Sequence, residues 1–337
     1  MIQFQSVTKI FEDGTTAVDD LSFQIREGET FGLIGTSGCG KTTTLKMINR
    51  LVEPTSGTIQ INGSESTSQD PEKLRRQIGY VIQDVGLFPH YSVQQNIATV
   101  PKLLYWDERR IASRSEELLQ MVGLDPETYS ERKPQSLSGG QQQRVGLARA
   151  LAADPPIILM DEPFGALDPI TKRQIRMEVS SLFKQINKTI VLVTHDVFEA
   201  FELCDRLCLL DDGKMQQIGT SQELLFEPAN NFVDSFFASN RFQLELLSVT
   251  LSDILEQKNG EGELYWSPPL KEEQEDDEVK PTQTLYHILE EMEQRPQENL
   301  AIIHRVEKQV INSLGFSDLL DRFQQYKRKR KRREQDG

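Results

Sequence analysis

The sequence is poor in cysteine, in aromatic residues and in long hydrophobic runs. Its 337 residues include three cysteines, and aromatic residues make up 7%. Cys39 lies in a glycine-rich segment, and Cys204 and Cys208 do not have the CxxC spacing. This number and this spacing argue against a disulfide framework, and we expect three reduced thiols.

No apolar run approaches the roughly 18 residues that a membrane-spanning helix needs. The N-terminal segment MIQFQSVTKIFEDG also lacks the apolar core of a signal peptide. We therefore expect any role at a membrane to depend on a partner protein.

Positive charge is scarce as well. The chain has 38 Lys and Arg residues against 52 Asp and Glu residues, which gives a formal net charge of −14. General nucleic-acid binders carry a basic face, so we expect no nucleic-acid partner. Two charge blocks stand out: the acidic segment 271–280 (KEEQEDDEVK), which is typical of a solvated loop, and the fully cationic run 327–333 (KRKRKRR).

The alternation of predicted strands and helices indicates an α/β fold with a largely parallel sheet. Strands are expected at 2–11, 17–25, 30–34, 55–63, 78–84, 155–163, 188–195, 206–211 and 214–218. Helices are expected directly after residue 40 and at 107–122, 141–153, 170–187 and 196–203. The mostly helical part, residues 90–150, is expected to be an inserted subdomain, and a domain boundary is expected near 237–242.

The segment GTSGCGKT fits the phosphate-loop pattern G-x-x-x-x-G-K-[ST] at every fixed position, and it follows a predicted strand. Its glycines let backbone N–H groups approach phosphates, and the start of the next helix favours negative charge. Lys41 would bind the β- and γ-phosphates, and Thr42 would place its hydroxyl on Mg²⁺. The residues expected to bind the nucleotide here are Gly35, Thr36, Ser37, Gly38, Cys39, Gly40, Lys41, Thr42 and Thr43.

Polar residues end three other predicted strands. Asp161 and Glu162 follow the apolar run 157–160, where one carboxylate can bind Mg²⁺ through water and the next can deprotonate an attacking water. His195 follows IVLVT, at the carboxyl end of a strand, which is where ligands bind in α/β proteins. Gln83 follows the strand 78–82 and, taken alone, would be expected to be solvated.

A second glycine-rich helix start, LSGGQ at residues 137–141, precedes the helix expected at 141–153. It combines a hydroxyl and two glycines with a helix start, as phosphate-binding segments do. The chain already has a complete phosphate loop far upstream, so the residues alone leave open why one nucleotide site would need both segments.

Together these elements resemble the nucleotide-binding subunit of an ABC transporter over residues 1–237. The phosphate loop, Gln83, LSGGQ, the MDEP strand end, ALD (166–168) and His195 occur in the order of that family. The resemblance implies a P-loop ABC ATPase domain with a mostly parallel sheet and a helical subdomain, which uses ATP and Mg²⁺. It also implies a homodimer in which LSGGQ of one subunit caps the ATP on the partner's phosphate loop, through the N–H groups and dipole of a helix start.

The resemblance also assigns catalytic and cross-dimer roles. Glu162 would be the catalytic base, His195 would contact the γ-phosphate, and Lys41 would complete the catalytic set. Asp168 would act across the dimer. The residues expected to cap the partner's nucleotide are Ser138, Gly139, Gly140 and Gln141.

The remaining roles concern the base and the metal. Phe11 would stack on adenine, where many members of the family have tyrosine. Thr42, Gln83 and Asp161 would hold Mg²⁺, and Gln83 would also report the γ-phosphate to a membrane partner.

The segment EPFGALD, with Phe164, resembles importers more than exporters, and NIATVPKLLYW (96–106) resembles the branch that imports glycine betaine, choline and other quaternary amines. The implied partners are a separate integral membrane permease and, indirectly, an extracytoplasmic solute-binding protein. The implied location is the cytoplasmic face of the plasma membrane. Two alternatives stay open: an importer for another small solute, and a soluble ABC ATPase that acts on nucleic acid or ribosomes.

Residues 241–326 resemble the CBS modules that are appended to ATPases of that branch. Residues 284–326 resemble one CBS unit and 248–270 half of another, and TLSDILE (250–256) matches TLYHILE (284–290) at five of seven positions. We expect a degenerate α+β regulatory region, with a plain helical extension as the alternative. The basic tail 327–337 is expected either to contact an anionic membrane surface or to be solvated without a role.

Overall fold

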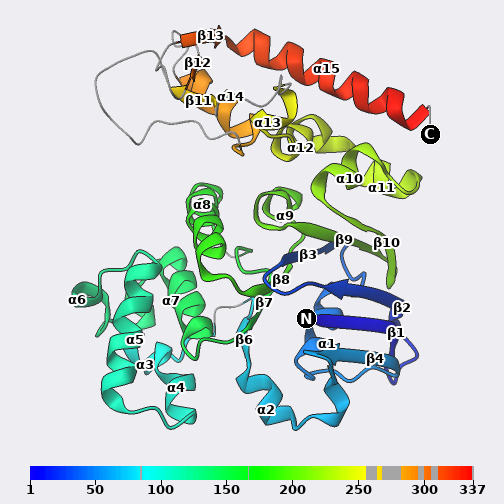
Figure 1. The fold of residues 1–337 in the computed structure, drawn as a ribbon. Helices are drawn as coiled ribbons and strands as arrows, with labels where there is room; N and C mark the ends of the chain where they lie inside the picture. The colour runs from blue at the N-terminus through cyan, green and yellow to red at the C-terminus, as the bar shows by residue number, and fades with distance from the viewer. Residues whose placement is uncertain are drawn as a thin grey trace. The chain divides into compact units, whose positions relative to one another are not determined.

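The computed structural model describes residues 1–83, 86–165, 167–255, 264–267, 282–294, 300–304 and 310–335. Within this range the chain forms two compact units, Met1–Thr220 and Ser221–Gly337 (Figure 1). Ala166 of the ALD segment and the acidic block 271–280 lie outside the described residues.

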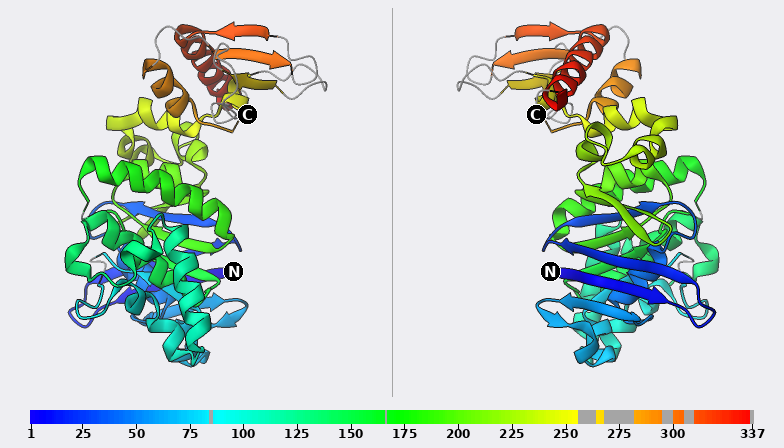
Figure 2. Two further views of the ribbon diagram at one scale, coloured as in Figure 1. Left: turned by 90° about the vertical axis from the view of Figure 1, so that its left-hand side faces the viewer. Right: turned by 90° about the vertical axis from the view of Figure 1, so that its right-hand side faces the viewer.

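Unit 1 contains an antiparallel sheet with the strand order β2-β1-β4-β5. Its strands are β1 (Ile2–Ile10), β2 (Thr16–Ile25), β4 (Ser56–Ile61) and β5 (Ser64–Glu65). The right-hand view of Figure 2 shows β1 and β2 at the surface of this unit. Phe4 and Phe23 stack with their ring centroids 4.5 Å apart, and Phe23 stacks in turn on Phe31 of the neighbouring sheet.

The second sheet of unit 1 has the order β10-β9-β3-β8-β7-β6, and every pair in it is parallel except β9 with β10. Its strands are β3 (Thr30–Gly35), β6 (Ile78–Val81), β7 (Ile157–Asp161), β8 (Thr189–Val193), β9 (Arg206–Asp211) and β10 (Lys214–Gly219). This confirms the predicted α/β fold and the predicted hairpin about Asp212 and Gly213.

The parallel sheet is buried on both faces, which explains its continuous apolar runs. Leu159 and Val191 belong to the core shared with the antiparallel sheet, whereas Ile158 and Ile190 belong to the core under the helices. The helices that accompany the sheet are α1 (Lys41–Ile48), α2 (Pro71–Arg76), α8 (Pro169–Ile186) and α9 (Val197–Leu203).

The predicted helical subdomain consists of short helices gathered on one side of unit 1 (Figure 1). They are α3 (Val93–Ile97), α4 (Thr99–Leu103), α5 (Glu108–Met121), α6 (Pro126–Tyr129) and α7 (Gly139–Leu151). The C-terminal end of α7 packs directly on β6, because a Cβ atom added to Gly79 would lie 2.4 Å from the carbonyl oxygen of Ala150. Arg149, also on α7, donates to the carbonyl oxygen of Gly86 at 2.7 Å.

Unit 2 begins earlier than the boundary expected near 237–242, because α10 packs against α12. Its helices are α10 (Ser221–Phe226), α11 (Asn231–Phe236), α12 (Arg241–Ser248), α13 (Leu251–Ile254), α14 (Leu285–Gln294) and α15 (Phe316–Gln335). Its sheet is antiparallel and consists of β11 (Leu264–Ser267), β12 (Leu300–His304) and β13 (Val310–Leu314), in that order.

The internal sequence echo corresponds to a reciprocal contact in unit 2. Thr250 and Thr284, the first residues of the two copies, form an isolated antiparallel bridge. Leu251 N donates to the carbonyl oxygen of Gln283 at 3.0 Å, and Leu285 N donates to that of Val249 at 2.9 Å. Each copy thus begins with the same pair of main-chain contacts to the other.

The basic run, which was expected either to contact an anionic membrane surface or to be solvated, continues α15 as helix. Lys327 forms an ion pair with Glu245, and Arg330 lies 3.2 Å from a carboxylate oxygen of Glu227. Glu245 is 2% exposed and also pairs with Arg241 at 3.1 Å. The first cations of the run therefore stabilise the packing of unit 2.

In the described part of the chain, none of the helices is both long enough and apolar enough to cross a membrane. The cysteines Cys39, Cys204 and Cys208 are free, as predicted, and burial raises the pKa of Cys208 to about 12.

Glu245→Ala should destabilise unit 2, because it leaves Arg241 and Lys327 without their shared carboxylate. We expect a loss of about 2 kcal/mol in the free energy of unfolding, as for hydrogen bonds to charged groups. Calorimetry of the full chain measures it, with Glu293→Ala on the exposed side of α14 as the control. Equal shifts in both variants would contradict the stabilising role of this ion pair.

Candidate functional site

The loop between β3 and α1 is shaped by glycines whose backbone conformations favour residues without a side chain. Gly35, Gly38 and Gly40 have φ values of 145°, 78° and 98°. A Cβ atom would lie 2.0 Å from a carbonyl oxygen at Gly35 and 2.2 Å from one at Gly40, whereas at Gly38 nothing lies within 4 Å. The loop therefore leaves open space over Gly38, where a bound group can approach the backbone.

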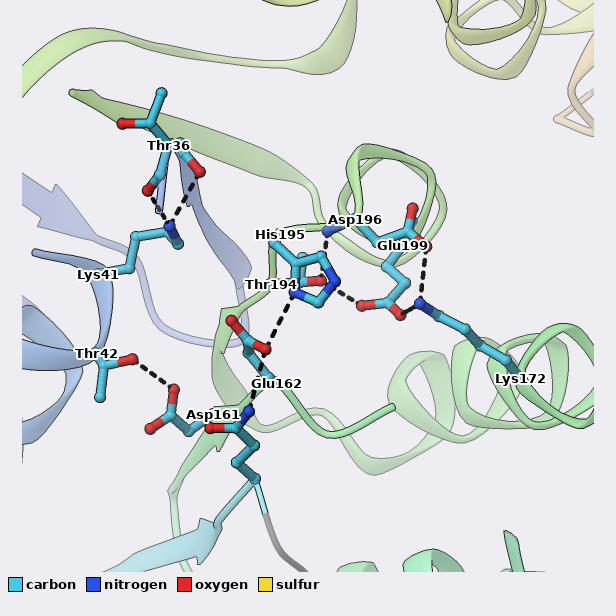
Figure 3. A network of polar contacts seen from close by, with 12 residues as sticks. Thr36, Lys41, Thr42, Asp161, Glu162, Lys172, Thr194, His195, Asp196 and Glu199 are labelled. Carbon is cyan, nitrogen blue, oxygen red and sulfur yellow. Dashed lines mark hydrogen bonds and ion pairs between the residues drawn. The ribbon is translucent and has the colours of Figure 1, made fainter. Parts of the chain in front are cut away.

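Lys41 opens α1 and turns its amine back over this loop (Figure 3). Its Nζ atom donates to the carbonyl oxygens of Gly35 at 3.0 Å and Thr36 at 2.7 Å, and the residue is 6% exposed. Gly40 at the helix start has no side chain with which to cap α1. A buried ammonium beside an uncapped helix start is a site for an anion such as a phosphate.

Thr42 and Asp161 bring two oxygen ligands together from α1 and β7. The Thr42 hydroxyl donates to Asp161 Oδ1 at 2.9 Å (Figure 3). Burial raises the pKa of Asp161, and the hydrogen bond from Thr42 acts in the opposite direction. Burial, together with the neighbouring Asp161, raises the pKa of Tyr80 to about 12.

These two oxygens fit Mg²⁺ rather than a cation held by protein alone. Among the described residues there is no cluster of three or more His, Cys, Asp or Glu side chains that could hold a metal. Mg²⁺ typically takes only one or two protein ligands and completes its octahedron with waters and substrate phosphates. Thr42 and Asp161 beside a phosphate loop match that requirement.

Glu162 holds a central position among the predicted catalytic residues. Its Oε2 atom lies 3.1 Å from His195 Nδ1 (Figure 3). The same oxygen lies 3.5 Å from Gln83 Nε2. Its backbone has a φ of 46°, and its N–H donates to the carbonyl oxygen of Val193 at 2.9 Å. The side chain is 22% exposed and that of His195 is 61% exposed, so the carboxylate can reach solvent while its orientation is fixed.

Ser138 starts α7 with a capping box and explains why the helix begins two residues before the predicted 141. Ser138 Oγ accepts from Gln141 N at 3.3 Å, and Gln141 Oε1 accepts from Ser138 N at 2.9 Å. Gly140 packs against α8, where a Cβ atom would lie 2.7 Å from Ile175. Ser138 and Gly139 are exposed.

The structure does not bring LSGGQ to the phosphate loop of the same chain. In the described residues, no hydrogen bond joins 138–141 to 35–43, and Figure 1 draws α7 and α1 well apart. Asp168 is exposed as well, and it caps α8 by accepting from Thr171 N at 3.1 Å. Hydrogen bonds that Thr171 donates lower the pKa of Asp168.

Phe11 follows β1 with 40% of its surface exposed, and Lys9 Nζ lies 5.2 Å from its ring centroid. A ring with an open face can stack on a planar base, as the resemblance implies.

Sequence reasoning missed the polar groups behind His195. Lys172 of α8 contacts both Asp196 and Glu199, and Glu199 is 2% exposed (Figure 3). The acidic residue directly after His195 was a signal that could have been used, since it can cap a following helix. Nothing in the sequence pattern pointed to Lys172.

Comparison with known proteins relates residues 18–165 to the ABC transporter family model. The chain is 54% identical over 241 residues to the glycine betaine/carnitine/choline transport ATP-binding protein of Bacillus subtilis (strain 168), covering 72% of this chain and 63% of that protein. It is 52% identical over 249 residues to the glycine betaine uptake system ATP-binding protein of Escherichia coli (strain K12), covering 74% and 80%. The chain thus matches less than two thirds of the Bacillus protein.

Solved ATP-binding cassettes have the same fold. The dimeric cassette MJ0796 bound to ADP and Pi is 35% identical with a TM-score of 0.58, over 65% of this chain and 98% of that one. The protein cbiO1 from Clostridium perfringens, part of the ABC transporter complex cbiONQ, has a TM-score of 0.62 at 26% identity, over 73% of this chain and 93% of that one.

Thr42→Val should make stability depend more strongly on pH. The folded pKa of Asp161 is raised, so the folded state binds a proton more readily and loses stability as pH rises through that pKa. Loss of the Thr42 hydrogen bond should raise this pKa further. We expect a loss of about 1.5 kcal/mol at neutral pH that shrinks as the pH falls through the folded pKa.

Urea unfolding at several pH values measures this difference, with Thr43→Val as the control because Thr43 is similarly half-buried. A pH-independent difference between Thr42→Val and the wild type would contradict the coupling of Thr42 to Asp161.

Proposed function

The chain belongs to the ABC transporter family, and we propose that it is the ATP-hydrolysing subunit of an importer for a quaternary amine of the glycine betaine, choline or carnitine type. The observation that carries the proposal is the Glu162 carboxylate, held 3.1 Å from His195 beside the Thr42–Asp161 pair and the phosphate loop. The names of the Bacillus and Escherichia relatives support the solute class.

ATP would be held by residues 35–43, with Phe11 against the adenine. Lys41 would exchange its bonds to the carbonyl oxygens of Gly35 and Thr36 for phosphate oxygens. Thr42 and Asp161 would hold Mg²⁺, with Gln83 as a further ligand, as the family resemblance implies. When bound, the ion supplies charge neutralisation at the β- and γ-phosphate oxygens.

Glu162 would act as the general base. It would accept a proton from water as the water oxygen bonds to the γ-phosphorus and the bond to the β,γ-bridging oxygen breaks. ADP and phosphate would then leave. His195 orients the carboxylate and faces the same space, which supports its proposed contact with the γ-phosphate. Lys41 would stabilise the negative charge that is spread over the transferring group.

The exposed start of α7 supports a head-to-tail homodimer. Ser138 Oγ already accepts from Gln141 N, so its hydroxyl proton is left to donate to a phosphate oxygen of the partner's nucleotide. Gly139 adds an exposed backbone at the same point, and Asp168 would act across the same interface. The dimeric cassette among the similar structures supports this arrangement.

The proposed importer includes a separate membrane permease, with a solute-binding protein contacting that permease on the outer side. We place the chain at the cytoplasmic face of the membrane. Arg328 and Lys329 on α15 are exposed, so an anionic membrane surface remains among the proposed contacts. Co-purification with a permease, and ATPase stimulation by glycine betaine but not by an unrelated amine, would test the solute class.

Glu162→Gln should bind ATP but hydrolyse it about 10²- to 10⁴-fold more slowly, because the amide keeps the size of the side chain and loses the base. ATP-dependent dimers should accumulate, and size-exclusion chromatography with ATP detects them. Glu178→Gln, on α8 and away from the phosphate loop, is the control. Turnover near that of the wild type in Glu162→Gln would overturn the assignment.

Ser138→Arg should leave ATP affinity of the monomer nearly intact and abolish turnover, because the new side chain would block the partner's γ-phosphate and not its own. Mixing this variant with Lys41→Ala subunits should restore one composite site of the two. Nucleotide titration of the monomer and turnover of the mixture are the measurements. Loss of ATP binding in the Ser138→Arg monomer would show that the site is not shared between subunits.

A further inference from the structure

His195 stands between two residues whose side chains are fixed. Thr194 is 1% exposed and donates its hydroxyl to Glu199, while Asp196 N donates back to Thr194 Oγ1 at 3.0 Å. Asp196 Oδ1 caps α9 by accepting from Phe198 N at 2.9 Å. The backbone on both sides of the histidine is therefore held by polar contacts.

Lys172 is the cation at the centre of these contacts. Its Nζ atom lies 2.8 Å from Asp196 Oδ2 and 2.7 Å from Glu199 Oε1. One positive charge thus faces two carboxylates, and the Lys172 side chain is 17% exposed. Hydrogen bonds from Lys172 lower the pKa of Asp196 against the effect of burial, which agrees with an ionised pair.

The same lysine belongs to the first turns of α8, which starts at Asp168. Lys172 N donates to the carbonyl oxygen of Asp168 at 2.9 Å, so the two residues share one rigid helical turn. Figure 3 shows the lysine reaching from α8 to the segment after His195. The segment that carries Asp168 and the segment that carries His195 are thereby joined through one side chain.

We propose that Lys172 is a positioning residue for ATP hydrolysis, which sets His195, and through it Glu162, relative to the start of α8. This inference rests on the proposed function. Lys172 does not touch the reacting atoms in this arrangement. Its effect passes through Asp196 and Thr194 to the histidine that lies 3.1 Å from Glu162.

Without Lys172, Asp196 and the buried Glu199 would face each other with no cation between them. Buried charges without a partner force rearrangement or protonation. Asp196 would keep its bond to Phe198 N, so α9 retains its cap and the change falls on the segment beside His195. We therefore expect loss of geometry at the site rather than loss of the fold.

The test compares Lys172→Met with Lys172→Arg and Lys188→Met in the full chain. Lys188 is a matched control, because it is 19% exposed and pairs with Asp154 at 2.8 Å, away from the site. We expect Lys172→Met to lower kcat for ATP about 10- to 100-fold, as misplacement of about 1 Å does. KM should change little, Lys172→Arg should restore most of kcat, and Lys188→Met should stay within about twofold of the wild type.

The His195→Ala background distinguishes positioning from a general structural effect. If Lys172 acts through His195, Lys172→Met should cause little further loss in that background, since residues that act as a unit are not additive. The same fold-loss in both backgrounds, or an equal loss in Lys188→Met, would overturn the proposal.

Lys172→Met combined with Glu199→Gln covers the case in which the single variant does not fold. The amide removes the buried charge that would lack a partner, so this double variant should fold and still show low kcat. Recovery of kcat to the wild-type value would overturn the proposal. A wild-type chain without ATPase activity would instead contradict the proposed function, so the two failures are distinguishable.

Discussion

The parallel pairing of β3, β7 and β8 determines where every candidate catalytic group lies. Parallel strands end at the same edge of a sheet, so the phosphate loop, Glu162 and His195 meet there although they are far apart in sequence. Main-chain bonds continue this alignment beyond the strands: Thr194 N donates to the carbonyl oxygen of Leu33, and Glu162 N donates to that of Val193. The backbone therefore sets the positions, and the side chains add only the final orientation.

Carboxylates in this acidic chain are placed according to the cost of burying charge. Ionised groups that leave water need a compensating partner. Asp161 has the Thr42 hydroxyl, Glu199 has Lys172, and Glu245 in unit 2 has both Arg241 and Lys327. Partners of this kind offset the cost of burying each charge, and they also restrict each acid to one orientation. Such restriction suits a site whose chemistry depends mainly on positioning.

The sequence predicted the strands, the phosphate loop and the grouping of Asp161, Glu162 and His195, because these follow from apolar runs and from glycine chemistry. It did not predict the partner of Glu199, since a lysine on a helix looks solvated until the helix is docked. Helix α7 begins at Gly139, two residues before the predicted start at 141, because Ser138 caps the helix. The sequence pattern was interpreted only as a phosphate-binding segment, and the capping role of Ser138 was not considered. The cationic run that begins at Lys327 was predicted as a tail. Its packing against α12 depends on a distant part of the chain and leaves no local pattern in the sequence.

The contact between Gly79 and Ala150 has a mechanical consequence. No side chain separates the end of α7 from β6, and packed interiors are barely compressible, so neither element can shift towards the other alone. Gln83 lies just beyond β6, and Ser138 lies at the far end of α7, whose 13 residues span about 20 Å. The helix therefore has one end fixed against β6, while Ser138 lies exposed at its opposite end.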